Sequence, residues 1–200
     1  MKKWLCFALA TLLLLCVGCG KDETDTQQSA ADEHHSHSHS DLKVEDCYTF
    51  TENKNGTYSY TVEWRGGGVL LTEQEMIRPV SFEVMNEDVL MMNGQAGTGV
   101  GARWARFCDI ENGRVSDVIG GYLAALDNLV AFVDQRTEAY HVFVCDPFKA
   151  YEYTQVVTLE GLVVDGDVIK DFALSKEGIL SVTYVTADGD KTATVDLKKE

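Results

Sequence analysis

Short runs of aromatic and β-branched residues, separated by turn-forming residues, fill the chain from Leu42 onward. The clearest pair of runs, residues 47–51 and 57–64, flanks the turn sequence Asn53-Lys54-Asn55-Gly56. Such runs around an Asn-Gly pair predict a β-hairpin, and Asp188-Gly189 predicts another near the end. The pattern therefore predicts a single, all-β domain of mostly antiparallel short strands over residues 42–200.

A weak internal repeat bears on how these strands are arranged into sheets. Several runs end in an apolar residue or cysteine followed by aspartate, at Asp109, Asp134, Asp146 and Asp196. Units of about 40–50 residues with several strands each are typical of propeller blades. A propeller-like arrangement and a meander or sandwich are both consistent with this spacing.

At most one or two short helices are expected. The segment Thr72-Glu73-Gln74-Glu75 fits a capping box and predicts a helix that ends near Arg78, because Pro79 follows.

The first 19 residues differ in composition from the rest of the chain. Two lysines follow Met1, residues 4–17 are almost wholly apolar, and Leu15-Cys16-Val17-Gly18-Cys19 precedes a polar stretch. The apolar run is too short to cross the roughly 30 Å hydrocarbon layer comfortably. This segment resembles the lipobox signal peptides of bacterial lipoproteins, although Cys16 stands where these signals usually carry leucine.

That resemblance implies that residues 1–18 are removed and that Cys19 carries lipid on its sulfur and its amine, as palmitate or similar chains. Several acyl chains together provide stable anchoring. The chain would then be attached to the cell membrane on its extracellular or periplasmic side. Residues 19–41 would form the lipidated cysteine and a tether.

The tether sequence is polar and contains four of the five histidines of the chain. A flexible coil of this length spans roughly 26 Å on average. His34, His35, His37 and His39 fall within six positions, between acidic residues. Neutral imidazoles bind Zn²⁺ and similar ions, so the tract is a candidate metal site. A low-complexity linker and a proton-sensitive tether are the alternatives.

The charge balance argues against nucleic acid as a partner. Of 17 basic residues, Lys2 and Lys3 belong to the signal, which leaves 15 against 32 acidic residues and a formal charge of about −17. Phosphate contacts need lysine and arginine, so nucleic acid and anionic lipid head groups would be repelled. High solubility, attraction of cations or a basic partner fit this composition.

Three cysteines remain in the body of the chain, Cys47, Cys108 and Cys145, so a monomer can form at most one disulfide there. A bond between Cys108 and Cys145 is the candidate. Alternation along residues 140–145 places His141 and Cys145 on one strand face, about 13 Å apart, too far for a catalytic pair. The motifs of serine hydrolases and of zinc peptidases are absent from the sequence.

The body also resembles uncharacterised extracellular β-domains of anaerobic Gram-positive bacteria, a resemblance that implies no catalytic residue. The sequence therefore favours a non-enzymatic lipoprotein that binds a partner at the cell envelope. Trp64, Trp104, Tyr151 and Tyr153 are candidate contacts if they face solvent. A zinc-binding lipoprotein is the alternative, and an envelope hydrolase with two facing carboxylates is a third hypothesis.

Calorimetry distinguishes the first two hypotheses. If the tract binds metal, titration with Zn²⁺ at micromolar concentration should release heat that disappears when residues 34–39 are deleted. Equal heats from the two chains would contradict a metal site on these histidines.

Overall fold

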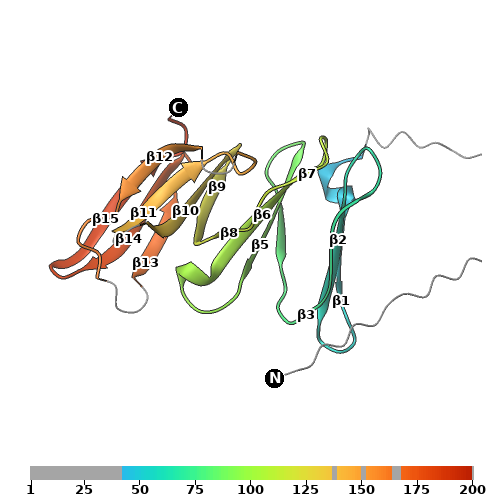
Figure 1. The fold of residues 1–200 in the computed structure, drawn as a ribbon, viewed down its shortest axis with the longest axis horizontal. Coiled ribbons are helices and arrows are strands. Elements are labelled where there is room, and N and C mark those ends of the chain that lie inside the picture. Colours follow the sequence, from blue (N-terminus) through green and yellow to red (C-terminus); the bar gives the residue numbers. More distant parts are fainter. Residues whose placement is uncertain (1–41, 137–138, 150–151, 164–167, 200) are drawn as a thin grey trace, which may run out of the picture. The chain divides into compact units, whose positions relative to one another are not determined.

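Four antiparallel sheets follow one another along the chain in a computed structural model that describes residues 42–136, 139–149, 152–163 and 168–199 (Figure 1). The first two sheets comprise β1 (Tyr48–Glu52), β2 (Tyr58–Glu63) and β3 (Val69–Met76), then β4 (Ser81–Val84), β5 (Val89–Gln95), β6 (Arg103–Asp109), β7 (Arg114–Val115) and β8 (Ile119–Gly120). The last two comprise β9 (Tyr122–Leu126), β10 (Leu129–Arg136), β11 (Ala139–Cys145) and β12 (Tyr153–Thr158), then β13 (Ile169–Leu174), β14 (Ile179–Thr186) and β15 (Gly189–Asp196). Among the described residues the only helices are two 3₁₀ turns, η2 (Val44–Cys47) and η3 (Val100–Ala102).

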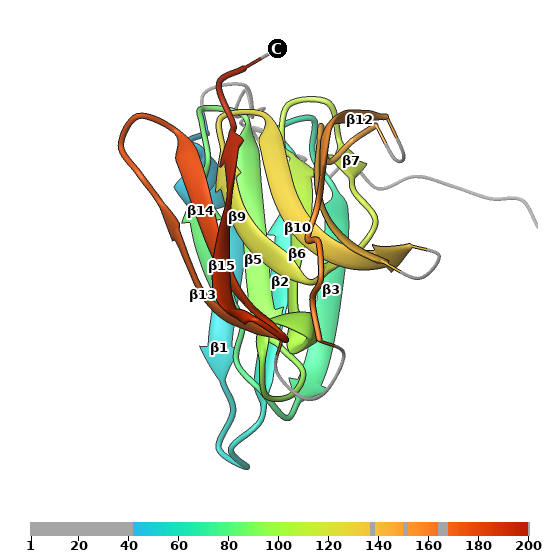
Figure 2. The ribbon, with the colours of Figure 1, turned by 90° about the vertical axis from the view of Figure 1, so that its left-hand side faces the viewer.

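Each sheet packs face to face on the sheet that follows it in the chain. One buried cluster joins the first sheet to the second, another joins the second to the third, and the largest joins the third to the fourth. Figure 2 shows the fourth sheet in front of the third and second, with their strands superimposed in projection. The all-β prediction is confirmed, and four consecutive meanders replace the two layers of a simple sandwich.

The two inner sheets are buried on both faces. In β5, Leu90 and Met92 point into the cluster shared with the first sheet, whereas Met91 points into the cluster shared with the third. In β10, Val130 and Ala131 divide between two clusters in the same way. Strands covered on both sides need apolar residues at successive positions, which explains why their sequences are continuous apolar runs.

The two outer sheets have one polar face. In β14 every second residue is buried, and Thr183 on the opposite face lies 3.2 Å, hydroxyl to hydroxyl, from Thr192 of β15. In the first sheet Thr61 and Thr72 form the same kind of pair, also at 3.2 Å. In β14 the alternation is strict, because only one of its faces packs against a neighbouring sheet.

Both predicted hairpins are confirmed. The Asn53–Gly56 segment lies between β1 and β2, and Ala187-Asp188 joins β14 to β15, with Gly189 as the first residue of β15. Asp127-Asn128 joins β9 to β10. Gly56 and Gly189 have φ values of 78° and 113°, a conformation that favours glycine.

The predicted helix after Thr72 is wrong, because this segment lies in β3. Thr72 pairs with Thr61, and its hydroxyl donates a hydrogen bond to the carbonyl oxygen of Tyr60 at 3.2 Å. Glu75, which a capping box would place in the first helical turn, has a φ of 57°. Pairing with the free edge of β2 satisfies more backbone groups than one isolated turn of helix could.

Trp104 sets a steric constraint within the second sheet. It pairs with Gly94 of β5 on one side and Gly120 of β8 on the other. A Cβ atom at Gly94 would lie 2.7 Å from the Trp104 ring, whereas one at Gly120 would meet nothing within 4 Å.

Gly94→Ala should therefore lower the free energy of unfolding by about 1–3 kcal/mol, because the indole must shift within a packed cluster. Gly120→Ala, on the opposite neighbour of the same tryptophan, should leave stability nearly unchanged. Urea denaturation of both variants measures the difference. Equal losses of stability in the two variants would show that the position of the Trp104 indole does not depend on the absence of a side chain at Gly94.

Candidate functional site

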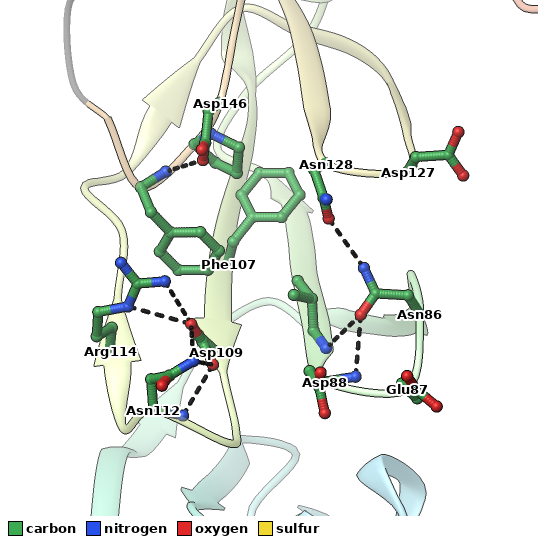
Figure 3. A pocket seen from close by; sticks show the side chains of 13 residues that line it. Asn86, Glu87, Asp88, Phe107, Asp109, Asn112, Arg114, Asp127, Asn128 and Asp146 are labelled. Carbon is green, nitrogen blue, oxygen red and sulfur yellow. Dashed lines mark hydrogen bonds and ion pairs between the residues drawn. The ribbon is translucent and has the colours of Figure 1, made fainter.

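A groove of about 400 Å³ opens between the second and third sheets, at the end where their turns meet (Figure 3). Two turns of each sheet supply its walls. They are the β4–β5 and β9–β10 connections and the segments that follow β6 and β11. We call it the acidic groove; it is lined by Asn86, Glu87, Asp88, Val89, Phe107, Asp109, Asn112, Arg114, Asp127, Asn128, Asp146, Pro147 and Phe148.

The repeated aspartates explain why corresponding turns of successive sheets resemble each other. Asp109, Asp146 and Asp196 each follow or end the third strand of their sheet. The carboxylate of each accepts a hydrogen bond from a backbone amide two or three residues later, at 2.9 Å. These bonds fix the chain reversal as an Asx turn. Three of the four aspartates in the sequence repeat thus mark a repeated turn, whereas Asp134 lies within β10 and pairs with His141. Asp109 and Asp146 line the acidic groove.

Asp109 is the most firmly held acid of the groove, with its side chain only 5% exposed. Its oxygens accept hydrogen bonds from the backbone and side-chain amides of Asn112 and from Nε and Nη2 of Arg114, the shortest at 2.6 Å. Burial raises the pKa of Asp109, but the hydrogen bonds from Asn112 and Arg114 outweigh it, so the pKa lies below its ordinary value. The carboxylate is therefore ionised at neutral pH and is unsuited to act as a general acid.

The opposite wall is built on a link between two hairpins. The Asn86 side-chain amide donates to Oδ1 of Asn128 at 3.1 Å and so connects the β4–β5 turn to the β9–β10 turn. Oδ1 of Asn86 accepts from the backbone amides of Asp88 and Val89. Figure 3 shows this link on the side of the groove opposite Arg114.

Aromatic rings and a proline form the apolar part of the groove. Phe107 and Pro147 are buried, and Phe148 is half-buried. The guanidinium carbon of Arg114 lies 5.0 Å from the centre of the Phe148 ring, within cation–π range. Arg114 therefore connects the second sheet, through Asp109, with the third sheet, through Phe148.

Negative charge predominates around the groove. Five of the residues that line it are acidic and one, Arg114, is basic. Arg65 binds Asp88 at 2.6 Å, and Lys149 approaches Asp146 at 3.7 Å. Glu87 and Asp127 are exposed, and their carboxylates form no hydrogen bond or ion pair with any described residue.

The neighbouring interface, between the first and second sheets, also contains an arginine bound to carboxylates. Arg65 donates to the carbonyl oxygen of Leu42 at 2.8 Å, to Asp88 at 2.6 Å and to Glu111 at 3.0 Å. Its side chain is 14% exposed. A guanidinium held by carboxylates and carbonyl oxygens thus lies between the first and second sheets.

The predicted disulfide is absent: Cys47, Cys108 and Cys145 are free and buried. Cys108 points from β6 into the cluster between the first and second sheets, whereas Cys145 lies in the cluster between the second and third. The prediction of a Cys108–Cys145 bond is wrong because alternation along β6 directs Cys108 away from the third sheet. Burial raises the pKa of both thiols to about 11, so neither forms a nucleophilic thiolate at neutral pH.

His141 is held on the third sheet, where its Nδ1 lies 3.1 Å from the Thr158 hydroxyl. The predicted alternation of its strand is confirmed, since Val142 and Val144 lie in one cluster and Cys145 in the other. His141 is also adjacent to Phe143, with ring centres 5.6 Å apart.

The predicted aromatic contacts have structural roles in part. Trp64 lies against Gly66, Gly68 and Gly113, and a Cβ atom at Gly66 would collide with its indole. Tyr153 packs on Phe143 with ring centres 4.6 Å apart. Tyr151 lies outside the described residues.

Cys19 and the histidines at 34, 35, 37 and 39 also lie outside the described residues, so their predicted roles in lipidation and metal binding remain predictions. Across the described part of the chain, no three histidine, cysteine, aspartate or glutamate side chains are grouped to hold a metal ion. Within the same residues, no helix combines the length and apolar character needed to cross a membrane.

No protein-family model and no curated protein matches the chain.

Sequence reasoning did not find the acidic groove. The aspartates were visible as a repeat, but Asn86, Asn128 and Arg114 lack a motif that would connect them. Their proximity depends on the stacking of the second and third sheets, which no short segment encodes.

Asp109→Asn should reduce the free energy of unfolding by about 1–2 kcal/mol at pH 7, because charge-assisted hydrogen bonds are lost. Free aspartate has a pKa of about 3.9, and the pKa of folded Asp109 is lower. The stabilisation is therefore present above about pH 4 and disappears as the pH falls through the folded pKa. Urea denaturation at several pH values measures both proteins.

The matched control is Asp188→Asn, in the exposed β14–β15 turn. It should change stability by less than about 0.5 kcal/mol. If the gap between the wild type and Asp109→Asn stayed constant down to pH 2, an ionised Asp109 would not be its cause.

Proposed function

We propose that this protein is a lipoprotein, anchored through Cys19 on the outer side of the cell membrane, whose β domain binds a partner through the acidic groove. The anchor rests on the lipobox-like sequence that ends at Cys19 and on the polar stretch that follows it. The tether of residues 20–41 would hold the domain away from the lipid surface.

The geometry of the acidic groove carries the binding role. Its walls come from four turns whose backbones are fixed by Asx hydrogen bonds and by the Asn86–Asn128 link. Loops held on a rigid scaffold are where binding residues concentrate. The groove volume of about 400 Å³ lies in the range of sites that accept small ligands or single side chains.

Binding fits the side chains of the groove better than hydrolysis does. Hydrolysis through two carboxylates requires one that is protonated near neutral pH. The pKa of Asp109, the most buried acid, is shifted in the opposite direction. The buried thiols are protonated and lie in the packed clusters.

A photo-crosslinking side chain in place of Lys149, an exposed residue next to Phe148 of the groove, tests the proposal in cells that carry the full-length chain. A discrete adduct of one defined mass is expected, and the same side chain at Thr72, on the polar face of the first sheet, should give none. Equal adducts from both positions would contradict a partner at the groove. In the same cells Cys19→Ser should move the protein out of the membrane fraction, and retention there would contradict the anchor.

A further inference from the structure

Strand β1 forms an open edge of the first sheet. Its five residues pair with β2 in one unbroken register, and no strand of the described chain pairs with its other side. Thr49, Phe50, Thr51 and Glu52 are exposed, and Figure 2 shows β1 at one lateral margin of the stack. An unpaired strand edge presents backbone donors and acceptors to any second strand that reaches it.

The other long edge strands of the described chain carry features that prevent such pairing. Register shifts interrupt the pairing of β3, β9, β12 and β13, and Glu75 of β3 has a φ of 57°. Strand β4 has four residues and begins two residues after Pro79, and β15 carries Asp190 and Lys191 near its start. Bulges, prolines and charges protect edges from a second strand. Residues 48–51 of β1 have none of them, so β1 is the edge suited to a partner.

The backbone of Phe50 faces this open edge. In the turn between β1 and β2, the amide of Asn53 donates to the carbonyl oxygen of Thr57 at 2.7 Å. Hydrogen-bonded and non-hydrogen-bonded pairs alternate along an antiparallel ladder. Thr51 therefore bonds to β2, whereas the N–H and C=O groups of Phe50 and Glu52 point away from it.

Aromatic rings lie beside the same edge, on the face that is turned to the second sheet. Phe50 is 39% exposed and stacks on Tyr58, with ring centres 5.8 Å apart. The Phe50 ring centre also lies 6.0 Å from that of Phe82 in β4, which stacks on Tyr48 at 4.4 Å. A strand added to β1 would cover the exposed part of Phe50 and extend this cluster of rings.

The edge carries little charge in a strongly acidic protein. Residues 47–51 and 57–62 contain no acidic or basic residue, whereas the chain has 32 acidic residues against 17 basic ones. Two copies of such a chain repel each other through their net charge. The uncharged edge is therefore where two copies approach at the lowest electrostatic cost.

We propose that two copies of the chain pair in antiparallel orientation through β1, about a two-fold axis at Phe50. Phe50 then lies opposite Phe50 of the second copy, and Thr49 lies opposite Thr51 of the second copy. The outward N–H and C=O groups of each Phe50 bond to those of the other. The interface is isologous, because both copies contribute the same strand.

Both side-chain pairs of this register already occur between neighbouring strands of the chain. Thr183 and Thr192 face each other on β14 and β15, with their hydroxyls 3.2 Å apart. Phe132 and Phe143 face each other on β10 and β11, with ring centres 5.5 Å apart. The segment Thr49-Phe50-Thr51 is symmetric about its phenylalanine, so pairing with itself forms both kinds of pair. This symmetry identifies a second copy as the partner strand.

A photo-crosslinking side chain in place of Glu52 tests the dimer in cells that carry two differently tagged full-length chains. The register places this position opposite Tyr48 of the second copy, so we expect an adduct of twice the chain mass that contains both tags. In extracts of these cells, added salt should increase the adduct, because salt screens the repulsion between two acidic copies. A basic partner would respond to salt in the opposite direction.

Charges on the outer face of β1 should control the dimer, since this face lies away from the buried clusters. Thr49→Glu combined with Thr51→Glu places like charges opposite each other across the two-fold axis and should lower the adduct at least about fivefold. Thr49→Lys combined with Thr51→Lys should have the same effect. When the acidic and the basic variant are made in one cell, opposite charges face each other and the adduct between them should return.

The matched control is Thr192→Glu combined with Thr194→Glu. These two exposed threonines have the same spacing on β15, an edge strand of the fourth sheet, and their substitution should leave the adduct unchanged.

Four results would overturn the dimer: no adduct at position 52, an adduct of a different mass, an adduct that persists in both charge variants, and no return of the adduct when the two variants are combined. An adduct of a different mass would mean that another protein occupies β1. The test is separate from that of the proposed function, because crosslinks at position 149 report on the acidic groove and crosslinks at position 52 report on β1.

Discussion

Burial of the two inner sheets on both faces is the constraint on which the rest of the structure depends. Strand β5 sends Leu90 and Met92 to one cluster and Met91 to the next, so neither neighbouring sheet can be removed without exposing apolar surface. The hydrophobic effect that drives this packing is proportional to the buried apolar area and has no direction of its own. The direction comes from the alternation of side chains along each strand.

Stacking sheets in this way also brings their polar turns together. A turn near a neighbouring sheet loses water, and its amides and carbonyl groups then need partners from the protein. The repeated aspartates meet this need within each turn, and Arg65 meets it between the first and second sheets by donating to the carbonyl oxygens of Leu42 and Glu87. At the acidic groove the carboxylates outnumber the arginine and lysine side chains that contact them. Two of the carboxylates, those of Glu87 and Asp127, form no ion pair within the described part of the chain.

The positions of the buried cysteines and of the tryptophans are also set by packing against their immediate neighbours. Cys108 and Cys145 lie in different clusters and behave as small apolar side chains. Trp64 and Trp104 each lie against glycines that leave room for an indole. The glycine-rich stretch at 66–68, which breaks the strand pattern in the sequence, makes space for the Trp64 ring in this way.

The sequence alone determined the secondary structure and most of the turns, because alternation, continuous apolar runs and Asn-Gly or Asp-Gly pairs act over a few residues. It also determined the acidic charge of the chain, and it carries the lipobox-like segment and the histidine tract, which lie outside the described residues. Only the tertiary structure decided the conformation of residues 72–78. Pairing with the free edge of β2 outweighed the local helix signal of this segment. The thiol pairing and the acidic groove were decided in the same way. Both depend on which face of β6 meets which neighbouring sheet, and that contact joins residues too far apart in the chain for any local pattern to specify.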